Sequence, residues 1–140
     1  MQAQELKQLN ERFNEEVFRR HRIDAIDELL TDDFIEHTPP PGAGTDRQAT
    51  KDFLALMLQA FPDLDISIES QIAEGDTVAT VAVMTGTHQG EFMGIPATGR
   101  QVAVRTMDTE RVRGGRFSEH WGIFDVPDLM GQLGVAPPMG

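Results

Sequence analysis

Two consecutive glycines, Gly114 and Gly115, separate two stretches with the composition of β-strands, Arg100–Arg113 and Arg116–Phe124. Both glycines can take the positive φ angles that a two-residue type I′ turn demands, so the two stretches are predicted to pair as a long antiparallel hairpin. The segments before the hairpin are expected to form a wall and a lid for it. The segment after it, Val126–Leu133, is expected to be a short closing helix.

The first part of the chain has the apolar spacing of helices. Steps of three and four residues predict an amphipathic helix over about residues 4–20 and a short second helix over about 23–30, ended by Thr31–Asp33. A third helix is expected to begin at Thr45, where Gln48 has the spacing of a capping box.

Most of the extended segments follow the third helix. Residues 64–72 alternate apolar and polar side chains, which predicts a strand with one solvated face, and 77–88 reads as a second strand. A brief extended piece at 34–37 precedes the proline- and glycine-rich stretch 38–44, which cannot be regular structure. Helices followed by antiparallel strands predict an α+β fold, with the helices on one face of a curved sheet and a concavity between them.

The composition restricts the class of protein. With 140 residues, the chain is expected to be a single domain, 1–140, with a loose Pro/Gly-rich tail from about residue 134. The absence of cysteine excludes disulfides, thiolate nucleophiles and cysteine-ligated zinc, and it fits a reducing compartment. A net charge of −11 disfavours nucleic acid and anionic membranes as partners. Because the sequence has no long apolar run and no apolar signal-peptide core, we expect a cytoplasmic protein.

Asp108 and His120 are the ionisable pair that the hairpin could bring together. A regular two-residue turn pairs Asp108 with Trp121 and Thr109 with His120, which leaves Asp108 and His120 on opposite faces. Only a bulge or a different turn length would place them together, and bulges are common beside active sites. A carboxylate and an imidazole in a water-poor pocket suffice for general acid/base chemistry. A purely structural Asp–His hydrogen bond is the alternative.

Two further histidines lie near the predicted concavity. His88 ends the second predicted strand, and His37 precedes the proline run; each is also consistent with a structural or surface histidine. The histidines have neither helical nor short-loop spacing, so the sequence contains no metal-binding motif.

Large apolar side chains gather in the 90–99 loop and in the last predicted strand. They are either core and oligomer contacts or the lining of a pocket for a flat, apolar small molecule. The set comprises Phe92, Met93, Ile95, Trp121, Ile123 and Phe124.

Several stretches are similar to one known family. GTHQGEFMGIPATGRQV, followed by GGRFSEHWGIFD and then LMGQLG, resembles the SnoaL-like polyketide cyclase family, also called ester-cyclase-like. The resemblance extends to the DDFIEH and FPDLDISIE segments and so covers most of the chain. The GEFMGIP loop and the EHW strand are its specific parts.

The resemblance implies the cone-shaped α+β barrel of the nuclear-transport-factor-2-like superfamily. In this fold a curved antiparallel sheet wraps around a pocket closed by N-terminal helices. It also implies a homodimer or higher homo-oligomer. Its cyclases close a ring in an aromatic polyketide by intramolecular aldol condensation, without cofactor or metal, and an aspartate serves as the general acid/base.

This sequence departs from the family pattern at the aspartate. An ungapped comparison places the family's catalytic aspartate on Gly122 and an assisting histidine on Asp108, whereas His88 and His120 match histidines of the pattern. Our hypothesis is a cofactor-independent cyclase or isomerase acting on a small, largely apolar carbonyl compound. The alternative is a non-catalytic binding protein that has lost its base. The candidate catalytic residues are Asp108 and His120, and the candidate substrate contacts are His37, His88, Phe92, Met93, Trp121 and Phe124.

Overall fold

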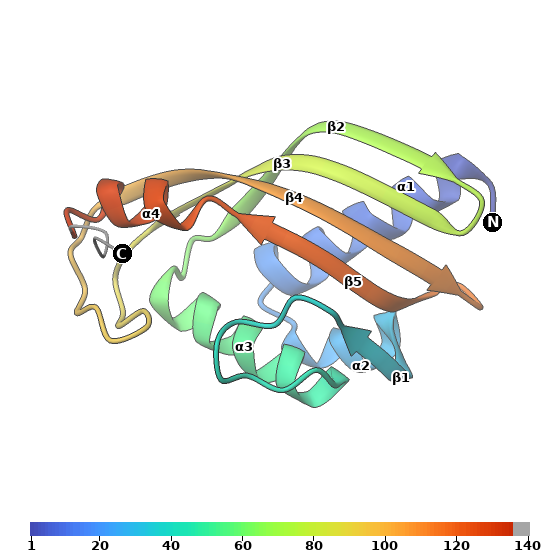
Figure 1. Ribbon diagram of the computed structural model, residues 1–140, viewed down its shortest axis with the longest axis horizontal. Helices are drawn as coiled ribbons and strands as arrows, with labels where there is room; N and C mark the ends of the chain where they lie inside the picture. Colours follow the sequence, from blue (N-terminus) through green and yellow to red (C-terminus); the bar gives the residue numbers. More distant parts are fainter. Residues whose placement is uncertain (136–140) are drawn as a thin grey trace.

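A curved sheet of five strands carries the main helices on one face (Figure 1). The computed structural model describes residues 1–135, and the predicted tail lies outside the described residues from 136 on. The elements are α1 (Ala3–Phe13), continued by a π-helical segment (Asn14–Arg19), a 3-10 turn (Ile23–Ala25), α2 (Ile26–Leu29), β1 (Leu30–Glu36), α3 (Arg47–Ala60), β2 (Asp65–Glu74), β3 (Thr77–Thr87), β4 (Gln101–Arg113), β5 (Arg116–Phe124) and α4 (Val126–Gln132).

The predicted α+β class is confirmed, but the sheet is mixed, not antiparallel throughout. The strand order is β1-β5-β4-β3-β2, and β1 lies parallel to β5 at the edge. The second helix ends at Leu29, just before Thr31–Asp33, but these residues already belong to β1, so the strand begins earlier than the predicted extended piece 34–37. Arg116 explains the early end of α2, because its guanidinium donates hydrogen bonds to the backbone carbonyls of Asp27 and Leu30, at 2.9 and 2.6 Å.

The start of α3 differs from the prediction by one residue. The residue that caps the helix is Asp46, whose carboxylate accepts a hydrogen bond of 2.8 Å from the amide of Ala49. The predicted capping box of Thr45 and Gln48 is wrong, since the Gln48 amide donates to Asp52 at 2.8 Å.

A bulge in β5 changes the register of the hairpin. Arg113 pairs with Arg116 as predicted, but the register shifts after Val112 so that Asp108 lies opposite Gly122 and Glu110 opposite His120. The predicted pairing of Asp108 with Trp121 is therefore wrong. The bulge places Asp108 and His120 on the same, inner face of the sheet.

A second bulge in β2 reverses the faces of that strand after Ile68. Ile66 and Ile68 face inward, opposite Met84 and Ala82, whereas Ile72 faces outward with a relative exposure of 69%. Ile72 does not continue the inner apolar face that the alternating pattern predicted. Two bulges also bend the sheet, since each increases the local twist of its strand.

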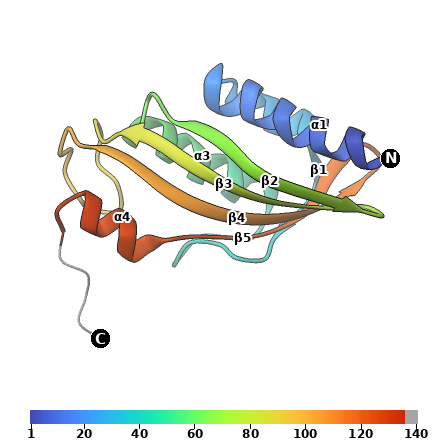
Figure 2. The same cartoon turned by 90° about the horizontal axis from the view of Figure 1, so that it is seen from above.

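The core consists of two apolar clusters at opposite ends of the concave side. One includes Leu6, Val17, Ile26 and Phe117 and packs between the N-terminal helices and the sheet. The other forms around Phe61, with members from α3, β3, β4 and α4. Figure 2 shows α1 running along one face of the sheet, with α4 near the opposite end.

No helix within residues 1–135 combines the length and the apolar character that a membrane span requires.

Gly90 fixes the 88–99 loop against the end of α3. Its amide donates to the carbonyl of Ala60 at 3.1 Å, and a Cβ at Gly90 would lie 2.4 Å from the carbonyl oxygen of Gln59. We expect Gly90→Ala to lower the free energy of unfolding by about 2 kcal/mol in urea denaturation, because the backbone must move to admit the methyl group. Gly131→Ala is the control, since a Cβ there meets nothing within 4 Å and this helix gains propensity. Equal stability of the two variants would contradict the packing argument.

Candidate functional site

A cavity of about 500 Å³ lies between the helices and the inner face of the sheet, and residues from both core clusters line it. Most of its wall is apolar and aromatic, with no lysine or arginine among the lining residues. Its ionisable side chains all lie on β1, β4 and β5. The apolar lining includes Phe13, Phe34, Phe53, Met57, Met84 and Phe124.

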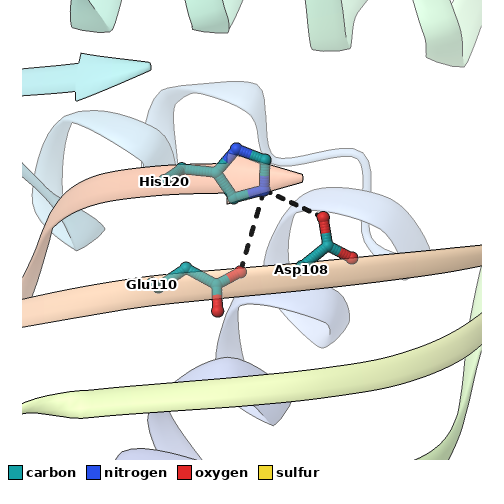
Figure 3. Close-up of side chains that lie close together, drawn as sticks. All are labelled: Asp108, Glu110 and His120. Carbon is teal, nitrogen blue, oxygen red and sulfur yellow. Dashed lines mark hydrogen bonds and ion pairs between the residues drawn. The ribbon is translucent and has the colours of Figure 1, made fainter. Parts of the chain in front are cut away.

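His120 is the centre of the polar wall. Its Nε2 lies 2.9 Å from Asp108 Oδ1, and its Nδ1 lies 2.5 Å from Glu36 Oε2. Glu110 Oε1 is 4.0 Å from the same Nε2, so two carboxylates of β4 approach one ring nitrogen (Figure 3). The predicted Asp108–His120 contact is therefore present, and a carboxylate on each side fixes the ring.

Gly122 supplies the space in which this pair meets. A Cβ at Gly122 would lie 2.4 Å from Asp108 Oδ1 and 2.8 Å from His120 Nε2, distances that a real side chain cannot adopt. The amide of Gly122 donates to Thr38 Oγ1 at 2.8 Å, and that hydroxyl donates to Glu36 Oε1 at 2.8 Å. A glycine where the resemblance implies an aspartate is thus what allows a different carboxylate to reach His120.

The carboxylates keep His120 in its charged form. Burial by itself lowers the pKa of His120, but the hydrogen bonds to Asp108 and Glu36 outweigh it and raise the pKa to about 10. For Glu36, burial acts to raise the pKa, and the contacts with His120 and Thr38 prevail and lower it. At neutral pH the site therefore holds an imidazolium whose ring N–H groups donate to two carboxylates.

Glu110 differs from the other carboxyl groups. Burial raises its pKa to about 8, and the negative charges of Asp108 and Glu36 add to this against the opposing effect of His120. Its Oε2 is buried without a hydrogen-bond partner in the described part of the chain. Glu110 is thus mainly a neutral carboxylic acid at pH 7.

The other sequence-predicted site residues lie elsewhere, apart from Phe124, which lines the cavity. His88 is fully buried against Phe61, and its Nδ1 lies 3.0 Å from Thr98 Oγ1. His37 stacks on Trp121 with ring centroids 4.3 Å apart, on the face of β5 opposite to His120.

Phe92 and Met93 are also absent from the cavity lining. Phe92 packs edge-on against Phe61 in the core, whereas Met93 is 56% exposed at the loop tip. As ligand contacts, these two residues, His37, His88 and Trp121 stay predictions.

Sequence reasoning missed Glu36, Thr38 and Glu110. Glu110 shares the parity of Asp108 on one strand, a signal that was available once Asp108 had been chosen. Glu36 had no such signal, because it reaches His120 across 84 residues of sequence through a parallel strand pair.

The same cluster contains the ligand atoms that a cation would need. Asp108, Glu110 and His120 each offer one such atom within 4.8 Å of the others. However, Asp108 occupies Nε2 of His120 and Glu36 occupies Nδ1, so a cation would have to displace the ring proton from Nε2. The hydrogen bonds in the structure are those of a proton-sharing site.

Comparison with known proteins shows which family the chain belongs to. The profile of the family described as SnoaL-like polyketide cyclase matches residues 8–133. The chain belongs to this family. A search of curated proteins found no match.

Solved structures of this SnoaL-like fold agree over nearly the whole chain. IdmH from Streptomyces antibioticus, a protein of proposed polyketide cyclase activity, is 33% identical, with a TM-score of 0.80 over 93% of this chain and 99% of that one. AclR from Streptomyces galilaeus, a proposed hydroxylase, is 29% identical, with a TM-score of 0.85 over 97% of this chain and 100% of that one. TsrD from Streptomyces laurentii, 24% identical with a TM-score of 0.85 over 96% and 98% of the two chains, shows the fold alone.

The raised pKa of His120 makes stability depend on pH. The pKa of His120 in the folded state, about 10, exceeds the ordinary value of 6.5. The stabilisation that protonated His120 provides is therefore complete below pH 6.5 and is lost as pH rises through 10. Glu110 acts in the same direction between pH 4.5 and 8. Since the chain has neither tyrosine nor cysteine, we expect urea denaturation to show stability falling by about 1.4 kcal/mol per pH unit between pH 8 and 10.

Two histidine variants test whether the pH dependence of stability comes from His120. His120→Gln should remove most of this slope, whereas His21→Asn, which removes an exposed imidazole, should keep it. A slope that is the same in both variants would contradict the assignment of the proton to His120.

Proposed function

We propose that this protein catalyses proton transfer next to a carbonyl group of a small, neutral, largely apolar molecule, as a cofactor-independent cyclase or isomerase. The observation that carries the proposal is the chain of hydrogen bonds from Glu36 through His120 to Asp108, which ends at the cavity. Asp108 is the general base, and His120 is the positively charged partner that orients it. We also propose a cytoplasmic location, which a chain without cysteine fits.

The geometry leaves Asp108 one oxygen for a substrate. Oδ1 is bound to His120, and Oδ2 has no hydrogen bond recorded within residues 1–135. Since Asp108 lines the cavity with a side-chain exposure of 29%, it is the carboxylate best placed to meet a ligand there. A base held by an imidazolium is pre-positioned, which is what general base catalysis requires.

The lining supports a neutral substrate. The cavity contains Glu36, Asp108 and Glu110 and only one cationic group, His120. An anionic ligand would lie close to these carboxyl groups and would find no arginine or lysine on the cavity wall. A flat ketone or polyketide-like molecule fits the aromatic walls and the volume of about 500 Å³.

The reaction can be written without an oxidant or reductant. Asp108 accepts a proton from the carbon next to a carbonyl, and the C–H electron pair becomes part of an enolate. The enolate carbon then forms a bond to a second carbonyl carbon, and the proton returns from Asp108 to the new alkoxide. IdmH, of proposed polyketide cyclase activity, supports ring closure, whereas AclR, a proposed hydroxylase, indicates that the family alone does not decide the reaction.

A non-catalytic ligand-binding protein is the second candidate. It rests on Gly122, which stands where the resemblance implies the catalytic aspartate of the family. Both candidates use the same cavity and differ only in whether Asp108 removes a proton from carbon.

Exchange of carbon-bound hydrogen tests the base without knowledge of the substrate. We expect the wild-type protein to accelerate the exchange of the α-hydrogens of a neutral aromatic ketone, 1-tetralone, in D₂O, followed by NMR. Asp108→Asn should lower the protein-catalysed rate by about 100-fold or more, since it removes the general base. Gly122→Ala should lower it by about tenfold or more, because the added methyl group separates Asp108 from His120.

Glu119→Gln is the control for these variants. It makes the same carboxylate-to-amide change on the outer face of β5 and should leave the exchange rate unchanged. Equal rates in the wild type and Asp108→Asn would remove Asp108 as the base. No exchange above background in the wild type would favour the binding protein.

We further propose that the outer face of the sheet joins two copies of the chain. It exposes a group of large apolar side chains, with Ile72, Met107 and Ile123 at 69%, 50% and 67% relative exposure. Together with Trp121 they border a shallow depression on the sheet. Exposed apolar surface of this kind is typical of a protein interface.

Light scattering at low micromolar concentration tests the association. The wild type is expected to be a dimer or larger, and Met107→Glu with Ile123→Glu is expected to give a monomer, because each buries a charge in an apolar contact. Leu56→Glu is the matched control, since Leu56 is 61% exposed on α3, away from this face. A monomeric wild type would contradict the proposal.

A further inference from the structure

Glu110 lies beside the proposed base but has no role in the reaction as written above. It lies two residues from Asp108 on the inner face of β4 and lines the cavity with a relative exposure of 9%. Figure 3 shows both carboxyl groups on the strand below the His120 ring. Glu110 Oε1 is 4.0 Å from His120 Nε2, which is too long for a hydrogen bond.

The surroundings of Glu110 do not stabilise a negative charge on it. The titratable groups that face it are Asp108 on its own strand, His120 of β5 and Glu36 of β1. His120 already donates both of its ring N–H groups, to Asp108 and to Glu36. The polar cavity residues of the N-terminal helical segments and of β3 are neutral: Asn10, Asn14 and Thr80.

A buried carboxyl group in such surroundings keeps its proton, and its O–H then needs an acceptor. The structure records no protein acceptor for it within residues 1–135, since Oε2 has no partner and Oε1 has only the distant ring. Oε2 is closed off from solvent, so Oε1 is the oxygen that can present the proton to the cavity, which Glu110 lines. An acceptor in the cavity has to come from the ligand or from water.

We propose that Glu110 is a neutral carboxylic acid that donates a hydrogen bond to the carbonyl oxygen of the ligand, while Asp108 acts on the carbon next to that carbonyl. This inference rests on the proposed function for the role of Asp108, and it adds a second group that touches the reacting atoms. It also defines the substrate more closely, as a neutral molecule whose carbonyl oxygen lies at the β4 wall of the cavity.

The two carboxyl groups complete the transfer of charge. When Asp108 takes the α-proton, the C–H electron pair forms a carbon–carbon double bond and the carbonyl π pair moves to oxygen. Glu110 gives its proton to that oxygen as the charge develops, which yields an enol. When the enol carbon attacks the second carbonyl, the enol proton returns to Glu110, and Asp108 passes its proton to the new alkoxide. No atom or electron is left over.

The pKa of Glu110 agrees with this division of roles. Burial raises it to about 8, so Glu110 is mainly a donor at pH 7 and loses that ability as pH rises beyond 8. Asp108 has different surroundings, because it is partly exposed at the cavity and its Oδ1 accepts a hydrogen bond from His120. Two carboxyl groups that lie on one strand in different environments can serve as acid and base.

Binding of two matched probes tests the donor. 1-Tetralone carries a carbonyl and tetralin does not, so the ratio of their dissociation constants isolates the hydrogen bond. We expect the wild type at pH 7 to prefer tetralone by about fivefold, with a downfield ¹³C shift of its carbonyl on binding. The preference should fall between pH 7 and 9.

Two variants at Glu110 complete the test. Glu110→Gln keeps a donor of the same shape, so the preference should persist and become independent of pH. Glu110→Leu removes the donor and should abolish the preference while tetralin still binds. A wild type without the preference, a preference retained in Glu110→Leu, or an unchanged pH dependence in Glu110→Gln would overturn the proposal. Glu110→Gln alone remains decisive if Glu110→Leu does not fold.

The Asp108→Asn variant separates this inference from the proposed function. It should lower the rate of α-hydrogen exchange by about 100-fold or more and retain the preference for tetralone. If the wild type exchanges no hydrogen but shows the Glu110-dependent preference, the proposed reaction fails and the donor role stands. If α-hydrogen exchange depends on Asp108 but the preference for tetralone is the same in the Glu110 variants, only the donor role of Glu110 fails.

Discussion

The site depends on one imidazole, His120, that is hydrogen-bonded through both ring nitrogens. Glu36 holds Nδ1 from β1, and Asp108 holds Nε2 from β4, so the three side chains connect three neighbouring strands. Charged hydrogen bonds in a low-dielectric interior are strong when complete and costly when one partner is lost. The contacts that orient the proposed base therefore also help to hold the parallel edge strand on the hairpin.

The sheet presents two different surfaces because its faces are set by bulges. The bulge in β5 brings His120 to the inner face beside Asp108, and the bulge in β2 sends Ile72 to the outside. The inner face lines a cavity that contains Asp108 and His120, and the outer face exposes the large apolar side chains of Ile72, Met107 and Ile123. One extra residue in each of two strands is enough to separate a ligand site from a candidate contact surface.

Local chemistry made much of the fold predictable. The Gly114–Gly115 turn and the bounds of β5 follow from the sequence. The type of turn and the residue composition of a strand depend on residues that are adjacent along the chain. The pairing of β1 with β5 does not follow, since it joins segments more than 80 residues apart. The sequence does not predict the bulge in β5 either, because nothing distinguishes Ser118 from an ordinary strand residue.

The same division applies to the site. Asp108 and His120 could be singled out by residue type, but their contact depends on the bulge. The family resemblance implies an aspartate at the position of Gly122, so the glycine suggested that the catalytic base had been lost. The packing shows instead that Gly122 leaves room for Asp108 to contact His120. The room available to a side chain at position 122 depends on residues of the neighbouring strands. It therefore cannot be predicted from the sequence of one strand.

The close approach at Gly122 also makes positions 108 and 122 epistatic. A Cβ at 122 would collide with Asp108 Oδ1 and with the His120 ring, so an aspartate cannot be restored at 122 by one substitution while Asp108 keeps its place. A change in either position alters which residues the other can accept. Moving the acidic group from position 108 to position 122 would therefore require changes at both positions.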